Sequence, residues 1–375
     1  MKKILIVSTV SRQFYLFEQG NIEVLKSLGF EIHAAANFSD ANERLDALDI
    51  IRHHFEIQRS PFSIKNIKAY KQLKEVMKSE NFHAIHCHSP MGSVLTRLAA
   101  RSIGLSPVIY TAHGFHFYKG APIINWLVYY PIEKHLSKYT DIQITINQED
   151  YKRAKRLASK KVKYVPGIGI DAIGFNKFSV SNREKKRQEL NIPKEAIVLL
   201  SVGELNKNKN HEVIIKSMRE VEDENVFYII CGKGDKEEYL KKLVNSLDLI
   251  DKVKFLGFRN DIPEINIASD IFAFPSFREG LSVSLMEAMA AGLPVICSNI
   301  RGNVDLIEND KGGYLINPKD VGGFAKAINE LSSNRNKRNS FGAYNLKKVT
   351  MFEKENVMKE MSKLYSEVSA HVSKQ

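Results

Sequence analysis

The stretch of sequence that decides the fold covers residues 274–295. It reads Phe274-Pro275-Ser276-Phe277-Arg278-Glu279-Gly280-Leu281-Ser282-Val283-Ser284-Leu285-Met286-Glu287-Ala288-Met289-Ala290-Ala291-Gly292-Leu293-Pro294-Val295. An apolar run leads into a loop with a glycine, a longer apolar segment follows, and a Gly-Leu-Pro turn precedes the next apolar run. This order predicts a strand, a tight loop, a helix, a turn and a second strand. The stretch is typical of a parallel α/β sheet.

The same alternation extends along the chain in both directions. Short apolar runs rich in branched residues predict strands at 3–10, 31–36, 84–88, 108–112, 142–146 and 161–165. In the second half they predict strands at 196–202, 226–231, 253–256, 271–275, 295–298 and 313–316. Amphipathic segments at 14–28, 64–79 and 148–158 predict intervening helices. The fold class is therefore α/β, with two Rossmann-like, doubly wound parallel sheets.

A segment without apolar periodicity, residues 167–187, separates the two sets of strands and collects Gly, Asn, Ser and charged residues. We predict a first domain at 1–178, a second domain at 179–350, and a final helix at 351–375 that crosses back to the first domain. A chain of 375 residues is long enough for two cores. Because parallel sheets bind ligands beyond the carboxyl ends of their strands, two such domains facing each other would form a central cleft.

The formal net charge of +12 favours an anionic partner, and nearly all of the excess lies before residue 181. A phosphorylated substrate, an acidic membrane surface and nucleic acid would each explain it, and so would a solvated face without a partner. The basic residues between 152 and 163 make a nucleic-acid-binding protein one alternative. No helix-turn-helix, zinc or RNA-binding signature accompanies them, so we expect no nucleic acid as a partner.

The three cysteines, Cys87, Cys231 and Cys297, lie far apart in apolar settings, which favours a reducing cytoplasm over disulfides or a zinc site. The apolar start at residues 4–7 is too short for a signal peptide. No stretch approaches the roughly 20 apolar residues of a membrane-spanning helix. We therefore expect a cytoplasmic protein that touches a membrane surface without crossing it.

Two carboxylates stand out in the opening stretch, Glu279 in the predicted loop and Glu287 in the predicted helix. Gly280 allows a sharp turn, and Ser282 or Ser284 can cap the helix, so that its first N–H groups would suit a phosphate. The carboxylates could accept hydrogen bonds from the hydroxyls of a sugar or a ribose. A surface glutamate followed by a helical glutamate would show the same spacing, so spacing alone does not decide between the two.

The whole string resembles the Glu-x7-Glu signature of retaining glycosyltransferases with the GT-B fold, in the large family numbered four, and in particular bacterial capsule and exopolysaccharide enzymes. The resemblance implies a nucleotide-sugar site in the second domain and an acceptor site in the first. Glu287 would bind the donor ribose and Glu279 the transferred sugar, while the diphosphate would be held by the backbone amides of Gly280, Leu281 and Ser282. The family often has proline where Ser282 stands.

A second match, residues 201–211, follows the first predicted strand of the second domain and places Gly203 and Lys209 in the donor site. Lys209 falls where the family has its diphosphate-binding lysine, because these enzymes stabilise the departing diphosphate with side chains instead of a metal. No Asp-x-Asp tripeptide occurs, and we expect neither a metal nor a cofactor. Glu204 stands where many members carry a second phosphate-binding arginine. The alternatives for that cation are Lys207, Arg259 and Arg278. Residues 231–235 resemble the family's Gly-x-Gly turn beside the nucleotide.

In the first domain, His113 follows a predicted strand where the family has a histidine that contacts the donor sugar. The resemblance therefore implies a catalytic set of His113, Lys209 and Glu279. His116 and Arg12 are further candidates for contact with the acceptor or the sugar. His83, His86, Cys87 and His88 are zinc-type side chains, but in a strand His86 and His88 share one face while Cys87 takes the other, and we expect no metal site.

These matches imply a metal-independent transfer of a hexose or N-acetylhexosamine, with retention, from a nucleoside-diphosphate sugar to a glycan; a UDP-sugar is favoured. Aromatic residues between 110 and 130, with Lys119, Lys134 and Lys138 nearby, suit either core packing or an interfacial contact. With the basic half, they predict a polyprenyl-diphosphate-linked acceptor at the inner, anionic face of the cell membrane, in bacterial surface polysaccharide synthesis. A sugar-nucleotide epimerase or phosphorylase of the same fold is the alternative enzyme.

Overall fold

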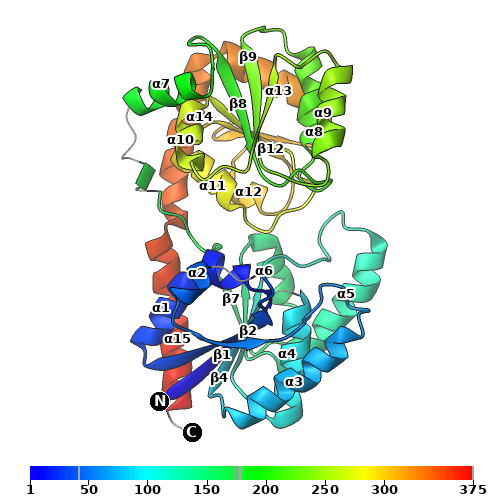
Figure 1. The fold of residues 1–375 in the computed structure, drawn as a ribbon, viewed down its shortest axis with the longest axis vertical. Coiled ribbons are helices and arrows are strands. Elements are labelled where there is room, and N and C mark those ends of the chain that lie inside the picture. The colour runs from blue at the N-terminus through cyan, green and yellow to red at the C-terminus, as the bar shows by residue number, and fades with distance from the viewer. Residues whose placement is uncertain (41–42, 89, 173, 176–179, 374–375) are drawn as a thin grey trace. The chain divides into compact units, whose positions relative to one another are not determined.

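The computed structural model describes residues 1–40, 43–88, 90–172, 174–175 and 180–373. The chain forms two compact units, one made of Met1–Gly169 with Lys354–Gln375 and the other of Ile170–Glu353 (Figure 1). The predicted domain boundary at residues 178 and 179 lies outside the described residues. No described helix is both long and apolar enough to cross a membrane.

The first unit alternates strands and helices along the chain. Its elements are β1 (Lys2–Val10), a π-helical turn (Phe14–Glu18), α1 (Gln19–Ser27), β2 (Phe30–Asn37), α2 (Glu43–Asp46), β3 (Ile51–His54), α3 (Lys65–Ser79), β4 (Ala84–His88), α4 (Pro90–Ile103), β5 (Val108–Ala112), α5 (Ile123–Leu136), a 3-10 turn (Ser137–Tyr139), β6 (Ile142–Thr145), α6 (Gln148–Ala154), β7 (Lys161–Tyr164) and α15 (Lys354–Val372).

The second unit repeats this alternation. Its elements are α7 (Val180–Glu189), β8 (Ile197–Val202), α8 (His211–Ser217), a 3-10 turn (Met218–Glu220), β9 (Val226–Cys231), α9 (Glu237–Ser246), β10 (Val253–Gly257), α10 (Ile262–Ala268), β11 (Ile271–Phe274), α11 (Val283–Ala290), β12 (Val295–Ser298), α12 (Asn303–Leu306), β13 (Gly313–Ile316), α13 (Val321–Ser333), α14 (Arg335–Val349) and a 3-10 turn (Thr350–Phe352).

Both sheets are parallel and doubly wound, which confirms the predicted fold class. Within the described residues the first has the strand order β3-β2-β1-β4-β5-β6-β7 and the second β10-β9-β8-β11-β12-β13. The direction of the connections therefore reverses between β1 and β4 and again between β8 and β11. Such a switch point opens a crevice beyond the carboxyl ends of the strands. The loops that follow these four strands are thus placed to bind ligands.

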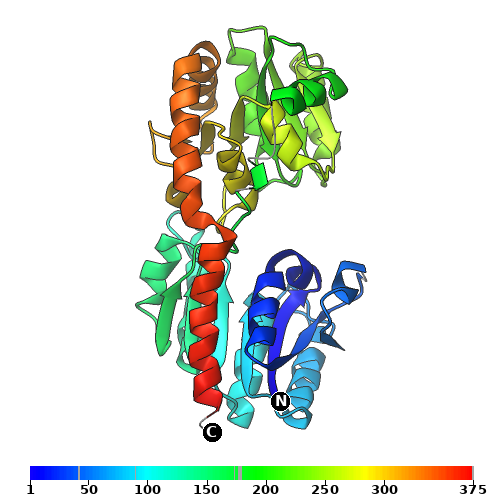
Figure 2. The same ribbon diagram turned by 90° about the vertical axis from the view of Figure 1, so that its left-hand side faces the viewer.

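Helices cover both faces of each sheet, and apolar side chains from the strands fill the layers between. The five residues of β4 and the five of β5 are all buried, as expected for central strands of a parallel sheet. In the first unit α15 packs against α1 (Figure 2). The apolar face expected at its helical spacing is buried, from Val357 and Met361 to Leu364, Tyr365 and Val368.

One strand was missed by the sequence predictions, and one predicted helix differs in the structure. β3 was not predicted, because Ile51 is followed by Arg52, His53 and His54 and the strand is an edge strand that is largely exposed. The single helix expected at residues 14–28 is a π-helical turn followed by α1. Pattern analysis assumes the ordinary helical repeat and cannot detect this change of pitch.

The segment 167–187, expected to be an irregular connection, contains the first part of helix α7. Polar contacts, which apolar periodicity does not reveal, hold this helix. Arg183 Nη2 and Arg187 Nη2 each lie 2.6 Å from a carboxylate oxygen of Asp270. Arg187 also donates to the carbonyl oxygens of Ala268 and Ala196. The helix is therefore tied to the start of β11.

Candidate active site

Residues 274–295 contain the connection from β11 to α11. Ser282 is the N-cap residue of α11, and its Oγ accepts a hydrogen bond from the backbone N–H of Leu285 at 3.4 Å. Of the two serines considered as caps, Ser282 therefore takes the role. The other N–H groups of the first turn have no helical partner and lie at the positive end of the helix dipole. This end of α11 favours an anion.

Lys209 and Glu279 meet in an ion pair beside this helix end, with 2.8 Å between Lys209 Nζ and Glu279 Oε1. Their loops follow β8 and β11, the two strands at the switch point of the second sheet. The ammonium also lies 4.7 Å from the centroid of the Phe274 ring. A β-carbon on Gly203 would lie 3.2 Å from the Lys209 stem, so the glycine makes room for it. Both pair members are mostly buried, which strengthens their attraction.

Backbone and amide contacts join the two loops. Phe277 N–H donates to the carbonyl oxygen of Asn208 at 2.8 Å, and Asn208 Nδ2 donates to the carbonyl oxygen of Arg278 at 3.0 Å. Asn210 Nδ2 donates to the carbonyl oxygen of Pro275 at 3.0 Å. These contacts fix the loop that carries Lys209 relative to the loop that carries Glu279.

Glu287 lies on α11, one helical turn beyond the cap, and its carboxylate has no hydrogen-bond or ion-pair partner among the described residues. Burial raises the pKa of this carboxyl group to about 7, because the charged form loses hydration without gaining a cation. A carboxyl group held in this way is ready to accept hydrogen bonds from a hydroxyl pair of a ligand.

The raised pKa of Glu287 predicts a pH-dependent stability. The folded state binds the proton more tightly than the unfolded state, so Glu287 reduces the free energy of unfolding as pH rises from about 4.5 to about 7. Glu287→Gln removes this titration and is nearly isosteric with the protonated acid. We expect the variant to match wild type in Tm at pH 5 and to exceed it by several degrees at pH 8.5, corresponding to roughly 1–3 kcal/mol. Equal Tm values at both pH values would contradict the assignment.

The second diphosphate-binding cation stays a prediction, and its candidates differ in exposure and in partners. Glu204 is exposed and accepts a hydrogen bond from Asn206. Arg259 pairs with Glu189 and Asp261, and Lys207 and Arg278 are both exposed.

Arg301, which was not predicted from the sequence, contacts the loop that carries Glu279. It is buried, and its Nε donates to the carbonyl oxygen of Glu279 at 3.2 Å. Arg301 follows β12, outside both quoted motifs, and no sequence signal distinguished it from other arginines. Its contact supports the backbone of the Glu279 loop.

Gly302 also approaches this loop closely. Its φ is +83°, and a β-carbon there would lie 2.1 Å from the carbonyl oxygen of Gly280. Gly302→Ala therefore has to displace the backbone that leads into α11. We expect the variant to bind nucleotide at least tenfold more weakly, measured by calorimetry. Alanine at positive φ should also lower the free energy of unfolding by about 1 kcal/mol.

Gly29→Ala is the matched control for this variant. Gly29 has φ +80° in the other unit, but a β-carbon there meets no atom within 4 Å. It should lose stability alone and keep full nucleotide affinity. An equal loss of affinity in both variants would contradict a specific role for the contact between Gly302 and Gly280.

The Gly-x-Gly turn after β9 lies very close to the backbone of the loop that follows β8. A β-carbon on Gly232 would lie 1.9 Å from the carbonyl oxygen of Gly203, and one on Gly234 would lie 2.3 Å from that of Leu205. Both glycines therefore let this turn pack against the loop that leads to Lys209.

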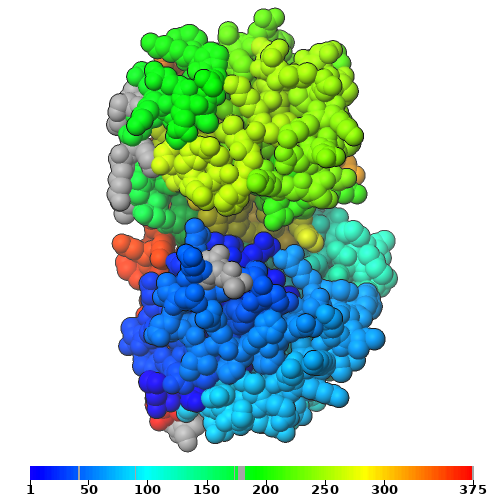
Figure 3. Space-filling model, viewed as in Figure 1, coloured from blue at the N-terminus to red at the C-terminus, as the bar shows by residue number. Residues whose placement is uncertain are grey.

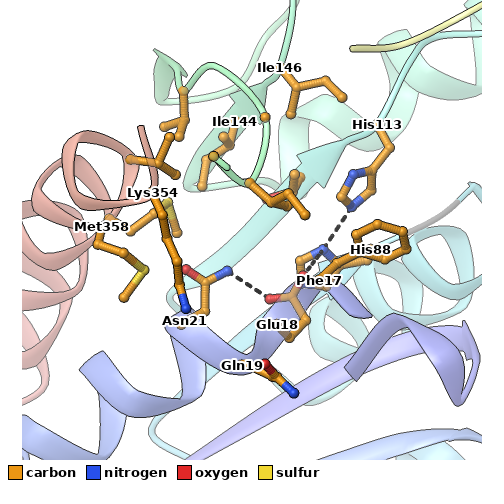
Figure 4. A pocket seen from close by; sticks show the side chains of 18 of the residues that line it. Phe17, Glu18, Gln19, Asn21, His88, His113, Ile144, Ile146, Lys354 and Met358 are labelled. Atoms are coloured by element: carbon orange, nitrogen blue, oxygen red, sulfur yellow. Dashed lines mark hydrogen bonds and ion pairs between the residues drawn. The ribbon is translucent and has the colours of Figure 1, made fainter. Parts of the chain in front are cut away.

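In the first unit, His113 follows β5 and lines a cavity of about 190 Å³ (Figure 4). His113 Nε2 lies 3.1 Å from His88 Nδ1, which in turn lies 3.4 Å from Glu18 Oε1. Gln13 bridges Glu18 and His113. Sequence analysis identified His113 but missed Gln13 and Glu18 and considered His88 only as a metal ligand. The carboxyl ends of β1, β4 and β5 bring these residues together.

The other two candidates of the first unit do not line this cavity. His116 has its ring 4.6 Å from that of Tyr129, and its carbonyl oxygen accepts a hydrogen bond from Asn125 Nδ2. Arg12 is exposed. Both therefore lie outside the pocket that contains His113.

Among the described residues, Glu18, His86 and His88 form a group whose ligand atoms lie within 4.8 Å of one another, close enough to hold a metal ion. Both ring nitrogens of His86 are already engaged, Nδ1 with Tyr365 Oη at 2.7 Å and Nε2 with Thr111 Oγ1 at 2.8 Å. A metal ion would have to displace one of these partners, so the group fits a hydrogen-bonded core better than a metal centre.

Comparison with known protein families covers both units. The family model described as glycosyl transferases group 1 matches residues 182–348, and the model described as glycosyl transferase 4-like matches residues 3–148. Among solved structures, HepE of Anabaena in complex with UDP and glucose superimposes with a TM-score of 0.80 and 21% identity, covering 98% of this chain and 100% of that one. WaaG, a glycosyltransferase involved in lipopolysaccharide biosynthesis, gives a TM-score of 0.72 at 14% identity, with 96% and 99% covered. Both share the fold.

Three relatives are similar in sequence. EpsD of Bacillus subtilis strain 168, named as a glycosyltransferase, is 36% identical over 371 residues, which cover 97% of this chain and 96% of EpsD. The UDP-Gal:alpha-D-GlcNAc-diphosphoundecaprenol alpha-1,3-galactosyltransferase of Escherichia coli is 31% identical over 72% of each chain. The capsular polysaccharide biosynthesis glycosyltransferase CapM of Staphylococcus aureus is 25% identical over 97% of each. Together with the two parallel sheets, these matches show that the chain belongs to the group 1 glycosyltransferases, family four, and has the GT-B fold.

Proposed function

We propose that this protein transfers a hexose or an N-acetylhexosamine from a UDP-sugar to a polyprenyl-diphosphate-linked glycan in bacterial surface polysaccharide synthesis. The observation that carries the proposal is the pair of Lys209 and Glu279 beside the N-terminus of α11. A cation, the amides of a helix end and a carboxylate therefore lie together at the switch point of the second sheet. The cation and the amides suit the diphosphate of a nucleotide sugar, and the carboxylate suits the hydroxyls of its sugar.

Each donor-site residue has a separate task in this proposal. Lys209 and the amides of Gly280, Leu281 and Ser282 hold the diphosphate, and Glu287 accepts hydrogen bonds from the ribose hydroxyls. Glu279 leaves Lys209 when donor binds and accepts hydrogen bonds from the transferred sugar. Uridine is the base we propose, because UDP-Gal stands in the name of the Escherichia coli relative.

The proposed reaction retains the configuration at the anomeric carbon. The bond between that carbon and the β-phosphate oxygen breaks, and a bond to the acceptor oxygen forms on the same face. The acceptor proton passes to the departing diphosphate, whose negative charge Lys209 and the helix-end amides stabilise without a metal ion. His113 contributes a hydrogen bond to a sugar hydroxyl.

The acceptor and its membrane are proposed from the first unit and the relatives. The Escherichia coli relative is named for a diphosphoundecaprenol-linked substrate. On α5, the side chains of Ile123, Ile124 and Leu127 are 77%, 61% and 67% exposed, and α5 forms part of the outer surface of its unit (Figure 3). Lys119, Lys134 and Lys138 nearby are exposed as well. An apolar helix face with a basic flank suits an anionic lipid surface at the cytoplasmic side of the membrane.

The aromatic residues of this region support core packing instead. Phe115 and Phe117 are buried with stacked rings, and Trp126 and Tyr130 pack onto Phe117. The membrane contact is therefore proposed for the aliphatic residues of α5 alone.

The transfer reaction can be tested with purified protein and undecaprenyl-diphosphate N-acetylhexosamine as the acceptor. Reactions contain UDP-glucose, UDP-galactose, UDP-N-acetylglucosamine or GDP-mannose in turn, and mass spectrometry detects an acceptor larger by one sugar. We expect one UDP-sugar to give product in the presence of EDTA. Transfer only from GDP-mannose, or only with a divalent metal, would contradict the proposal.

The membrane contact is tested by sedimentation with vesicles that contain phosphatidylglycerol. Wild type should bind these vesicles and not neutral ones, and the double variant Ile123→Ser/Leu127→Ser should lose about tenfold in affinity, because each exposed side chain buries apolar area in the lipid. Ile250→Ser/Phe258→Ser, at similarly exposed positions of the other unit, is the control. Equal binding of both variants would contradict a role for α5.

A further inference from the structure

A line of buried polar side chains in the first unit leads to His113. Glu18 closes the π-helical turn after β1, His88 ends β4 and His113 follows β5. These three strands are neighbours in the sheet, so their carboxyl ends deliver the side chains to one place (Figure 4). Glu18 and His88 are each 1% exposed. Groups this deeply buried have to satisfy one another, and their hydrogen bonds therefore determine where each proton lies.

Gln13 makes the nitrogen Nε2 of His113 an acceptor. Glu18 Oε1 accepts a hydrogen bond from Gln13 Nε2 at 2.9 Å, and Glu18 Oε2 accepts one from Asn21 Nδ2 at 2.8 Å. The same Gln13 nitrogen lies 3.4 Å from His113 Nε2. An amide nitrogen can only donate. Its two hydrogens therefore go to the carboxylate and to the lone pair of His113 Nε2.

His88 favours the same arrangement. Its Nδ1 lies 3.1 Å from His113 Nε2 and 3.4 Å from Glu18 Oε1. Each of these two neighbouring atoms can accept a hydrogen bond from an N–H group at Nδ1. Its Nε2 is buried without a partner among the described residues. A proton on Nε2 would leave a buried N–H without an acceptor, which is rarer than a buried lone pair without a donor. The proton of His88 therefore belongs on Nδ1, where it points at His113.

Each of the two imidazoles carries one proton near neutral pH. Burial lowers the pKa of His113 to about 4, against the smaller opposing effect of the Glu18 carboxylate, and it lowers the pKa of His88 to about 3. His86, which lies beside His88, does not compete for these hydrogen bonds, because Tyr365 and Thr111 engage both of its nitrogens. His113 is therefore neutral, with its one proton on either Nδ1 or Nε2.

We infer that Gln13, Glu18 and His88 are positioning residues that hold His113 with its proton on Nδ1, so that the ring offers an N–H donor to a sugar hydroxyl oxygen. His113 Nδ1 has no hydrogen-bond partner in the part of the chain that the structure describes. The opposite tautomer would offer a lone pair there and would place two N–H groups against each other at Nε2. The inference rests on the contact with a sugar that is proposed above for His113.

Nuclear magnetic resonance of the full chain, labelled with ¹⁵N at histidine, reads the tautomer directly. Long-range ¹H–¹⁵N correlations distinguish protonated from unprotonated ring nitrogens, and the signals of His113 are those absent from His113→Gln. We expect Nδ1 protonated and Nε2 unprotonated at pH 7.5. A proton on Nε2, a rapid exchange between both tautomers, or stoichiometric zinc bound through His88 would overturn the inference.

Gln13→Met tests whether the arrangement serves the reaction. The variant keeps the side-chain length and removes the donor, so we expect the His113 signals to shift towards a mixture of tautomers and kcat to fall about tenfold, with KM for the donor changed much less. Gln19→Met is the control, because Gln19 lines the same cavity and is exposed. It should leave both spectrum and kcat unchanged.

The outcomes separate this inference from the proposed function. If wild type transfers no sugar from any nucleotide donor, the proposed function is wrong, and the tautomer can still be read from the spectrum. If transfer occurs and Gln13→Met retains the wild-type spectrum and kcat, the positioning role is wrong. Loss of kcat in Gln13→Met and Gln19→Met alike would also overturn it, because a general disturbance of the cavity would then explain the effect.

Discussion

Replacement of Lys209 by methionine is expected to lower kcat by about a thousandfold. Methionine keeps most of the length and apolar stem of the side chain and removes the charge that we propose faces the diphosphate. That charge matters most in the transition state, when the bond to the β-phosphate oxygen breaks and negative charge accumulates on the leaving group. Steady-state transfer assays with the preferred UDP-sugar measure the effect.

Lys207→Met is the control for this variant. Lys207 lies in the same loop but is exposed, so its loss should change kcat by less than about threefold. Because Lys209→Met leaves the Glu279 carboxylate without its partner, Tm must be measured alongside. A folded Lys209→Met variant with near-normal turnover would remove Lys209 from the mechanism.

The second large effect is expected for Glu279→Gln, whose kcat with the UDP-sugar should fall about a hundredfold. The amide keeps the shape of the side chain but is a weaker acceptor for the sugar hydroxyls. Affinity for UDP itself should persist or improve, because UDP lacks the sugar and because Lys209 Nζ, 2.8 Å from Glu279 Oε1, is released for the diphosphate. Transfer kinetics and calorimetry with UDP together measure this difference.

Glu204→Gln is the matched control, since Glu204 is exposed at the start of the neighbouring loop and its charge is lost in the same way. The variant should change neither kcat with the UDP-sugar nor the affinity for UDP by more than about threefold. If Glu279→Gln weakened UDP and UDP-sugar equally, Glu279 would be part of the nucleotide site, and the division of tasks between Glu279 and Glu287 would be wrong.

The sequence predicted the central parts of the fold well, because buried parallel strands are continuous apolar runs. Elements whose stability has another origin were missed. β3 is a short, exposed edge strand, the turn at Phe14–Glu18 has an uncommon pitch, and α7 is held by two arginines on Asp270. None of these features produces a periodic apolar pattern.

The candidate site also contains residues that the sequence predicted and residues that it did not. Lys209 and Glu279 are 70 residues apart in the chain, and only the resemblance to a family connected them before the structure placed their charged groups in contact. Local sequence preferences limited the N-cap residue of α11 to Ser282 or Ser284, and the structure shows Ser282. Arg301, Gln13 and Glu18 were not predicted, because they belong to no quoted motif and because the contacts of Gln13 with His113 and of Glu18 with His88 join segments distant in the sequence. Long-range hydrogen bonds of this kind require coordinates.

The central claim is that the crevice between the β8 and β11 loops binds the nucleotide of the donor. Titration calorimetry with UDP tests it most directly, on wild type, Glu287→Gln and Lys209→Met at pH 8. One site per chain is expected in wild type, with UDP affinity at least tenfold weaker in each variant, because each loses a charge-assisted contact with the ribose or the diphosphate. Wild-type affinity for UDP in both folded variants would contradict the account.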